Sequence, residues 1–426
     1  MMRISLAPDY RRPLPGSVTQ QLLDPRGART VLGDQIASNG LPDPIRPQPN
    51  SLFGPRGVCL APHGGPFFVA DTGHHRLMIW NKVPQADNAD ADLLIGQPDF
   101  YSEGRNAHGP LGPATLNMPT GVSSDGKVLA IADAWNHRVL IWRTLPEHSN
   151  QPADLVLGQA DFSSGAANRG EATAAADTLN WCYGVTIADG RLFVADTGNR
   201  RVLVWNSIPQ RNGQPADLVL GQADATTRDD NASGVGGAVG MRWPHSVVVE
   251  NNKILVADAG NNRIMVWNSM PNADGAPCSF VLGQSGFDGN DHNRASYHPN
   301  NRALNMPYGM AIHDGSLVCA DTANSRLIGY PPDHPECSQR APRGGGCVAP
   351  PPANSRLIGY PLDDLRMDSA ACGLAAQSGF ADKGDNRWRF ATRDSVCWPF
   401  ALAASGNTLA IADTGNNRVL LWEAAS

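Results

Sequence analysis

Eleven histidines and eight cysteines are the side chains of this 426-residue chain that could hold a transition metal. A zinc site needs about four converging nitrogen or sulfur ligands at ~2.0–2.3 Å, and no Cys-x-x-Cys pair is present to supply two of them. His245 and Cys182 are the candidates, because each lies just before a strand-like run. Two ligands are too few, so we predict no metal and no cofactor.

Motifs for nucleophilic catalysis and for phosphate binding are absent as well. The chain has no Gly-x-Ser-x-Gly, no Walker sequence and no dinucleotide-binding glycine motif between a strand and a helix. The formal net charge of −6 gives no general attraction to nucleic acids or to anionic membranes. We therefore lean towards a protein that is not an enzyme and expect neither nucleic acid nor membrane as a partner.

The composition is that of a folded protein with a large core, since 41% of the residues are hydrophobic and 17% are charged. No apolar run approaches the ~18 residues of a membrane span, and Met1 to Pro8 do not resemble a signal peptide. The cysteines are scattered and are interpreted as free thiols. These features predict a cytoplasmic location.

An internal repeat covers nearly the whole chain. Six segments carry Ala-Asp followed by a turn, an Arg and an apolar run, and strand starts precede them at intervals of 64, 63, 62, 63 and 92 residues. Each unit contains four strand-like runs, as in 184–188, 191–197, 201–206 and 216–222. The fold class predicted is all-β, a six-bladed β-propeller of four-stranded antiparallel blades.

The two ends of the chain indicate how the ring closes. The sixth unit ends without a fourth strand, whereas Thr30-Val31-Leu32-Gly33 matches the fourth strand of another unit, Leu155-Val156-Leu157-Gly158. We expect this N-terminal strand to complete the last blade and remove the open sheet edge. The predicted domains are an N-terminal extension, 1–28, and a single propeller, 29–426.

The long fifth interval contains a duplication. Residues 323–331 recur unchanged as 353–361, an offset of 30, and 92 less 30 is the normal spacing of 62. We favour the first copy as the third strand, because Asp321 and Thr322 connect it through a short turn. Residues 332–354, with Cys337 and Cys347, would then be an insertion, either a docking or redox loop or a tolerated surface loop.

Residues that recur in every unit are interpreted as structural, because a catalytic group is needed only once. An Asp that ends one strand and an Arg that starts the next can close a hairpin turn by a charge-assisted pair. The terminal Trp of the third strand and the Gln of each Leu-Gly-Gln are expected to pack and to brace the blades. The Asp/Arg pairs are Asp71/Arg76, Asp133/Arg138, Asp196/Arg201, Asp258/Arg263, Asp321/Arg326 and Asp413/Arg418.

Function is expected where the copies differ at a shared position, and the three residues before each first strand do so. The third residues should encircle one mouth of the central channel. This mouth ring is Arg56, Thr120, Tyr183, His245, Tyr308 and Phe400. The first residues form a flanking ring, which is Gly54, Met118, Trp181, Trp243, Met306 and Trp398.

Two interpretations of these rings stay open. Trp and Met of the flanking ring could fill the gaps between blades, as core residues do. Alternatively, both rings line an aromatic mouth for a protein partner or a small apolar ligand. Arg, Tyr and His together are poor choices for simple packing, which favours binding at the mouth ring.

With six copies in register, the sequence resembles the NHL-repeat family of six-bladed propellers, whose Asn-His turn is present as Asn136-His137-Arg138. The repeat of about 62 residues is longer than usual and resembles a bacterial subgroup with the motif Pro-Ala-Asp-Leu-Val-Leu-Gly-Gln, 152–159. One relative of this fold, the peptide-amidating lyase, holds zinc through channel histidines. Here the mouth ring has His245 alone, because His63 and His313 belong to turns on the opposite face.

The function predicted is a non-catalytic binding or assembly scaffold that uses the channel mouth and the long loops between blades. A metal-dependent lyase or lactonase in the channel is the alternative, although Cys182 and Cys397 should face each other across the channel and not share an ion. Single-stranded RNA binding is a weaker alternative. The arginines that would serve it are Arg56, Arg242, Arg294, Arg302 and Arg387, with Asp288, Asp291 and Asp385 nearby.

Overall fold

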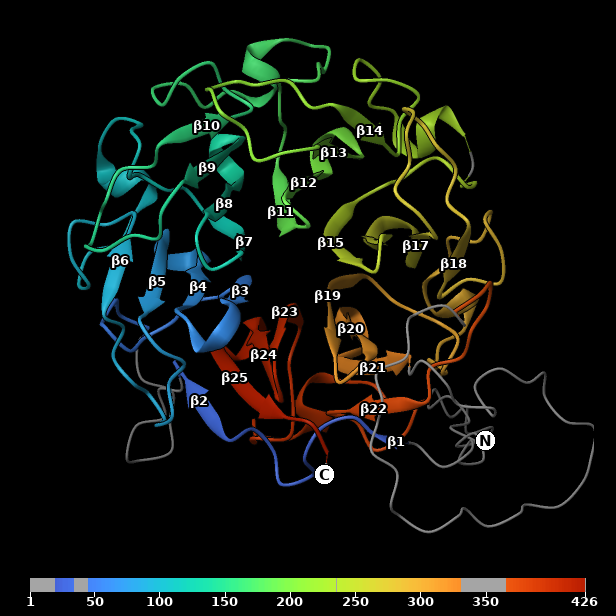
Figure 1. The fold of residues 1–426 in the computed structure, drawn as a ribbon. Helices are drawn as coiled ribbons and strands as arrows, with labels where there is room; N and C mark the ends of the chain where they lie inside the picture. Colours follow the sequence, from blue (N-terminus) through green and yellow to red (C-terminus); the bar gives the residue numbers. More distant parts are fainter. Residues whose placement is uncertain (1–19, 34–44, 235, 331–364, 426) are drawn as a thin grey trace, which may run out of the picture.

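The structure, a computed structural model, describes residues 20–33, 45–234, 236–330 and 365–425. Six antiparallel sheets radiate from a central axis (Figure 1), and this confirms the predicted six-bladed β-propeller. Five sheets have four strands, and the fifth blade has an additional strand, β1 (Gln20–Gln21), at its outer edge. Neighbouring blades touch through their inner strands and through their faces, so the ring is continuous.

Each blade runs from an inner strand at the axis to a fourth strand at the rim. The inner strands are β3 (Gly57–Leu60), β7 (Pro119–Ser124), β11 (Cys182–Ala188), β15 (Pro244–Glu250), β19 (Pro307–His313) and β23 (Pro399–Ser405). The second strands are β4 (Phe67–Asp71), β8 (Leu129–Asp133), β12 (Arg191–Asp196), β16 (Lys253–Asp258), β20 (Ser316–Asp321) and β24 (Thr408–Asp413). The third strands are β5 (Arg76–Trp80), β9 (Arg138–Trp142), β13 (Arg201–Trp205), β17 (Arg263–Trp267), β21 (Arg326–Tyr330) and β25 (Arg418–Glu423). The fourth strands are β6 (Leu93–Ile95), β10 (Leu155–Leu157), β14 (Leu218–Leu220), β18 (Phe280–Leu282), β22 (Gly373–Ala375) and β2 (Thr30–Leu32).

The helices of the described residues are short 3-10 turns, and none could span a bilayer. One set closes the hairpins between the second and third strands, and these are η2 (Thr72–His74), η4 (Ala134–Asn136), η6 (Thr197–Asn199), η8 (Ala259–Asn261), η10 (Thr322–Asn324) and η13 (Thr414–Asn416). A second set lies in the long loops between blades, and these are η3 (Arg105–His108), η5 (Ala167–Gly170), η7 (Asp230–Ser233), η9 (His292–Ala295) and η12 (Asp385–Trp388). One further turn, η1 (Pro62–Gly64), joins β3 to β4.

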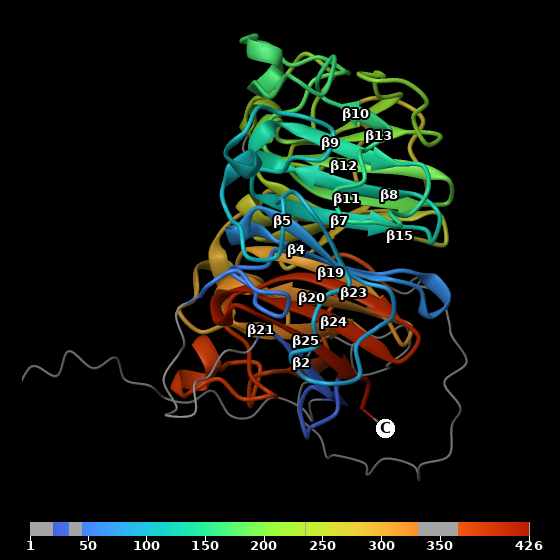
Figure 2. The same cartoon turned by 90° about the vertical axis from the view of Figure 1, so that its left-hand side faces the viewer.

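Because every blade repeats the same antiparallel order, all inner strands begin at one face of the ring. The hairpin turns of the first set and the long loops after each fourth strand lie at that face, which we call the top face. The long loops project to one side in Figure 2. The top face therefore carries both rings that the sequence singles out.

The hydrophobic core is divided into six clusters, each shared by two neighbouring blades. The strands between the inner and the outer edge are buried on both sides, because each sheet is covered by a blade on either face. Trp142 illustrates the expected role of the third-strand tryptophans. It belongs to a buried cluster that includes Phe68 of the preceding blade, and it donates its Nε1–H to the Gln151 carbonyl over 2.9 Å. The prediction that these residues pack between blades is confirmed.

The N-terminal strand closes the ring as predicted. β2 pairs with β25 in antiparallel register, with Val31 opposite Leu420. Contact with the propeller begins earlier in the chain, because β1 pairs in parallel with β22 and Leu23 is 2% exposed. Residues 20–28 of the predicted extension thus pack on the last two blades.

The first copy of the duplicated segment forms β21, which pairs with β20 and β22 as predicted. The second copy lies outside the described residues, and so does the insertion, 332–354, with Cys337 and Cys347. Five of the described cysteines are free. Cys372 is disulfide-bonded, so the interpretation of all cysteines as scattered thiols was wrong for this residue.

Candidate functional site

The repeated Asp/Arg pairs hold the top face together. Asp71 and Arg76 are opposite each other in the hairpin, fully buried, with Nε donating to Oδ2 over 2.8 Å. The other guanidinium nitrogens of Arg76 donate to the carbonyls of Ser51, in the preceding loop, and of Phe100, in the following loop. The same ion pair recurs in all six blades. The pairs lie in the hairpins, and their arginines also hydrogen-bond to the loops on either side.

Asparagine pairs, which were not predicted from the sequence, fasten five of the long loops to the next hairpin. Asn106 and Asn136 exchange amide hydrogen bonds across the joint, at 3.3 and 2.8 Å. Of four more pairs, three exchange both bonds, whereas in the pair of the fourth blade only Asn261 donates, to Asn231. All four have spacings of 30 or 31 residues, and that fixed spacing was a signal available in the sequence. They are Asn168/Asn199, Asn231/Asn261, Asn293/Asn324 and Asn386/Asn416.

The flanking ring is positioned by bonds between blades. The residue after each hairpin turn is left-handed, and in five joints its side chain accepts the backbone N–H of the next flanking residue. The five flanking residues so held have positive φ, between 46 and 54°. At the joint before the fourth blade, Arg200 is instead paired with Asp230, and Trp243 lacks positive φ. The loops therefore arrive at the mouth in a defined conformation.

The flanking tryptophans do not fill gaps between blades, so that interpretation was wrong for them. Trp181, Trp243 and Trp398 are 46, 41 and 44% exposed on the top face. Met118 and Met306 are half-buried. Trp181 lies 6.4 Å from Trp135, which joins it in an exposed aromatic pair. The flanking ring is an apolar surface around the mouth.

Four members of the mouth ring meet as a single aromatic cluster. The His245 ring stacks between Tyr183 and Tyr308, with centroids 5.1 and 4.2 Å away. Phe400 lies 4.6 Å from Tyr308, and the Arg56 guanidinium lies 5.3 Å above the Phe400 ring. Aromatic contacts and a cation–π contact at these distances stabilise the cluster. Five of the six predicted residues are therefore brought together.

The prediction was wrong for Thr120, the sixth residue of the mouth ring. Its side chain is fully buried, and its hydroxyl donates to the Tyr183 carbonyl of the next blade over 2.8 Å. A threonine side chain ends within reach of the neighbouring backbone, whereas the longer aromatic side chains extend past the strand ends. Thr120 thus joins two inner strands and does not contribute to the mouth.

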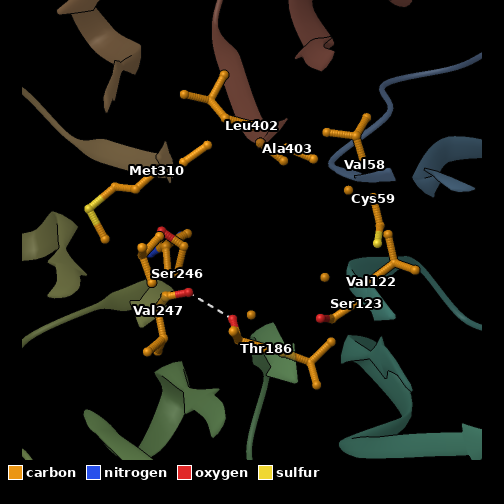
Figure 3. A pocket seen from close by; sticks show the side chains of 18 of the residues that line it. Val58, Cys59, Val122, Ser123, Thr186, Ser246, Val247, Met310, Leu402 and Ala403 are labelled. Atoms are coloured by element: carbon orange, nitrogen blue, oxygen red, sulfur yellow. Dashed lines mark hydrogen bonds between the residues drawn. The ribbon is translucent and has the colours of Figure 1, made fainter. Parts of the chain in front are cut away.

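A cavity of about 300 Å³ lies on the axis below the mouth, and Arg56, Tyr183, His245, Tyr308 and Phe400 line it. Figure 3 shows the side chains of the inner strands turned sideways between the blades, around an open centre. Hydroxyl groups bridge neighbouring inner strands, as where Thr186 donates to the Val247 carbonyl over 2.7 Å. The wall consequently consists of strand edges with small and aliphatic side chains.

The electrostatics of the mouth are those of a mostly neutral aromatic site with one cation. Burial lowers the pKa of His245 to about 4, and the charge of Arg56 lowers it as well. The Nδ1–H of His245 donates to the Trp243 carbonyl over 3.0 Å, which sets the tautomer. Burial raises the pKa of Tyr308 to about 12. At neutral pH the charge of this cluster is that of Arg56.

The candidate metal ligands do not converge. The Cys182 thiol is fully buried and donates to the Arg138 carbonyl, and Cys397 packs against Gly415. Neither thiol lines the channel, which corrects the expectation that they face each other across it. His63 and His313 lie at the turn between first and second strands, on the opposite face as expected. Nowhere in the described ranges do three His, Cys, Asp or Glu side chains gather as a metal site would require.

Most of the arginines considered for RNA binding are neutralised by acids. Arg294 and Arg302 both lie near Asp368, and Arg387 is paired with Asp394. Arg242 lies over the Trp243 ring and 3.7 Å from a carboxylate oxygen of Asp230. A continuous basic surface, which nucleic-acid binding needs, is not formed by these side chains.

The exposed large apolar side chains form a second feature of the top face. Ten such side chains occur among the described residues, and all ten lie in the top-face loops, turns and rings. They are Ile45, Phe53, Tyr101, Trp135, Trp181, Trp243, Tyr297, Trp388, Phe390 and Trp398. Three of them, Trp181, Trp243 and Trp398, were predicted from the repeat, and most of the others are aromatic residues of the long loops.

Comparison with known proteins agrees with the fold. Residues 241–267, which include the β16–β17 hairpin, match the family model of the NHL repeat. This match and the six-bladed ring together support an NHL-repeat propeller. No curated protein matches the chain significantly.

Solved structures with a similar shape include the Kuenenia stuttgartiensis hydrazine synthase, at 13% identity and a TM-score of 0.49, covering 87% of this chain and 96% of that one. The WD40 propeller domain of Doa1 has 9% identity and a TM-score of 0.44, covering 93 and 96%. A chain of the nidogen/laminin complex has 12% identity and a TM-score of 0.38, covering 71 and 87%. These similarities concern the shape of the chain alone.

Proposed function

We propose that this NHL-type propeller is a non-catalytic binding scaffold that engages a protein partner through its top face, with the channel mouth at the centre. NHL-repeat propellers are commonly protein-interaction modules. The long repeat and the motif 152–159 also lead us to assign the chain to the bacterial long-repeat subgroup. The residues that we propose for contact are the exposed members of the two rings and the aromatic residues of the long loops.

One observation carries this proposal: all ten exposed large apolar side chains of the described residues lie on the top face. Single exposed apolar residues are ordinary, whereas their concentration on one face marks interaction surfaces. Tryptophan and tyrosine also contribute most to binding energy at protein interfaces. Trp388 and Phe390 are 78 and 95% exposed, so most of their apolar surface remains in contact with water in the isolated chain.

The test is a quantitative pull-down with purified, immobilised protein, comparing Trp243→Ala and Trp398→Ala with the unchanged chain. Both side chains are exposed, so truncation should leave the fold intact. We expect a specific partner to be retained in 0.5 M salt, because apolar contacts are insensitive to salt screening. Each substitution should weaken its binding at least tenfold, as at an interface hot spot.

The matched control is Lys82→Ala, an exposed residue that follows β5 at the opposite face. This substitution should leave binding unchanged. Partner binding that survives both tryptophan substitutions, or that fails equally in the lysine variant, would refute the top face as the interface.

The two alternative functions, a metal-dependent enzyme and an RNA-binding protein, can be tested with the same purified protein. A lyase or lactonase would require bound metal in elemental analysis, lost on His245→Ala; the scattered positions of the candidate ligands do not favour it. Single-stranded RNA binding would show affinity that falls steeply with salt. The paired state of Arg294, Arg302 and Arg387 does not favour that function.

A cytoplasmic location is likewise a proposal. Free thiols, as in the five free cysteines of the described residues, are typical of the cytoplasm. The disulfide at Cys372 is instead typical of an oxidising compartment. Cell fractionation with antibody detection decides between the two, and recovery outside the cytoplasm would overturn the proposal.

A further inference from the structure

Arg56 differs from the other arginines around the mouth in having no acidic partner. Its guanidinium lies over the Phe400 ring, and no carboxylate of the described residues is within ion-pair distance of it. Arg242, Arg294 and Arg387 are each close to a carboxylate. A half-buried guanidinium keeps a need for hydrogen-bond acceptors, since it offers five donors in a planar fork.

Two tyrosines belong to the same aromatic cluster as the Phe400 ring that this cation covers. Tyr183 and Tyr308 flank the His245 ring, and among the described residues neither phenol has a hydrogen-bonding partner. Both line the same cavity as Arg56. Three donor groups therefore line one end of the cavity, and none of them is hydrogen-bonded to an acceptor of the described residues.

The cavity is also polarised along the axis. Of the side chains that line it, Arg56 and Glu250 are the charged ones. Arg56 precedes β3 at the top, whereas Glu250 ends β15 at the bottom. A negatively charged group would be attracted to the first and repelled by the second, so its orientation is set by charge.

We propose that the mouth cavity binds a small molecule or chain end that carries one carboxylate joined to an aromatic or aliphatic group. The carboxylate would accept from the Arg56 fork and the two phenols, and the apolar group would lie against Phe400 and the aliphatic wall below. A volume of about 300 Å³ is at the lower end of small-molecule sites. This size fits a group no larger than a phenylalanine side chain with its carboxylate.

A carboxylate fits this site better than a phosphate. One guanidinium matches one carboxylate in bidentate geometry, whereas a dianionic phosphate would leave a charge uncompensated. The His245 imidazole adds no second cation, because it is neutral at physiological pH. The carboxylate could belong to a free organic acid or to the C-terminal residue of a partner protein, and the chemistry at the mouth is the same.

This inference deepens the proposed function, since the mouth is the centre of the proposed interface. Its test does not need the partner. Isothermal titration of the full chain with 3-phenylpropionate and with its amide compares an anionic ligand with a neutral ligand of nearly the same shape. A second pair of ligands is a short peptide ending in phenylalanine, with a free or an amidated C-terminus. Comparing the two pairs shows whether the carboxylate belongs to a free organic acid or to a protein C-terminus. Inorganic phosphate is titrated in parallel.

We expect binding of at least one free acid and none of its amide. Arg56→Gln should weaken binding about 10- to 100-fold, because a charge-assisted pair is lost. Tyr308→Phe, which removes only a hydroxyl, should weaken it by a few-fold. Arg242→Gln is the matched control, since it removes the same charge from the same face outside the cavity, and it should leave binding unchanged.

Several results would overturn the inference. These are no binding of either free acid, equal binding of acid and amide, unchanged binding in the Arg56 variant, or phosphate binding more tightly than the acids. The proposed interface would survive each of these results if the Trp243 and Trp398 variants still lost their partner. Conversely, acid binding without any partner would support the cavity and not the interface.

Discussion

The backbone N–H of Trp181 donates a hydrogen bond to Nδ1 of His137 over 2.9 Å, across the joint between the second and third blades. Trp181 has a φ of 46°, so the bond holds an L-residue in a left-handed conformation that it rarely adopts. Asn262 makes the equivalent bond to Met306 with its side-chain oxygen. The five joints that make this bond use histidine, asparagine or, at Trp398, the Ser325 hydroxyl as the acceptor.

The first prediction concerns pH and this joint. Nδ1 can accept only when the imidazole is neutral, and burial lowers the pKa of His137. Below about pH 6.5 the unfolded chain then binds more protons than the folded one. The stability from His137 is therefore complete above that pH and is lost as the pH falls through the lower folded-state pKa.

His137→Asn should keep the bond, as Asn262 does, and should reduce the loss of stability between pH 7.5 and 5. His137→Ala should cost about 1 kcal/mol at pH 7.5 through the lost hydrogen bond. Urea unfolding at both pH values measures these differences. Equal pH dependence in the asparagine variant and the unchanged chain would show that His137 does not titrate as described.

The second prediction concerns the spacing of the inner strands. A Cβ on Gly57 would lie 1.8 Å from the Thr120 carbonyl oxygen and 3.0 Å from the Ala70 Cβ, so a small adjustment cannot relieve the contact. Gly57→Ala should destabilise the protein by at least about 2 kcal/mol, since the blades must move apart. Gly286→Ala is the control, because no atom lies within 4 Å of its added Cβ. Similar melting temperatures of the two variants would contradict the close packing.

The third prediction uses the duplicated segment as its own control. Arg326 is fully buried and paired with Asp321 over 2.6 Å, so Arg326→Ala should cost about 3–5 kcal/mol by leaving a buried carboxylate unpaired. Arg356→Ala changes the same residue of the second copy. It should leave the melting temperature unchanged, because Arg326 occupies the position beside Asp321. A similar loss of stability in both variants would mean that either copy can occupy the third-strand position beside Asp321.

The fourth prediction concerns the free thiols. Burial raises the pKa of Cys59 and Cys278 to about 12, and that of Cys182 well above its usual value. Because the thiolate is the reactive form, alkylation at pH 8 should be more than about a thousandfold slower in the folded protein than in urea. Peptide mass spectrometry reads each site separately. Rapid labelling of Cys182 in the folded protein would restore it as a functional thiol.

Much of this architecture can be derived from the linear pattern, because the six units repeat local features that act locally. Asp and Arg five residues apart must face each other across a hairpin, and an unpaired Thr30–Leu32 strand has one open sheet edge to join. Blade number, closure and the first copy of the duplication follow from such spacings. The Asn106/Asn136 type of pair was equally regular and could have been found in the same way.

The candidate site depended on the tertiary structure, because it is made by residues about 60 to 340 positions apart that meet only at the axis. Residues at the same position of the repeat are placed differently at the axis. Thr120 is short enough to hydrogen-bond to the neighbouring strand, whereas the Tyr183 side chain extends past that strand into the mouth. The exposure of Trp181 and the absence of an acid beside Arg56 likewise depend on which distant residues of the chain surround them. The periodic pattern determines the frame of the propeller, and the distances across its axis decide which side chains are left to bind.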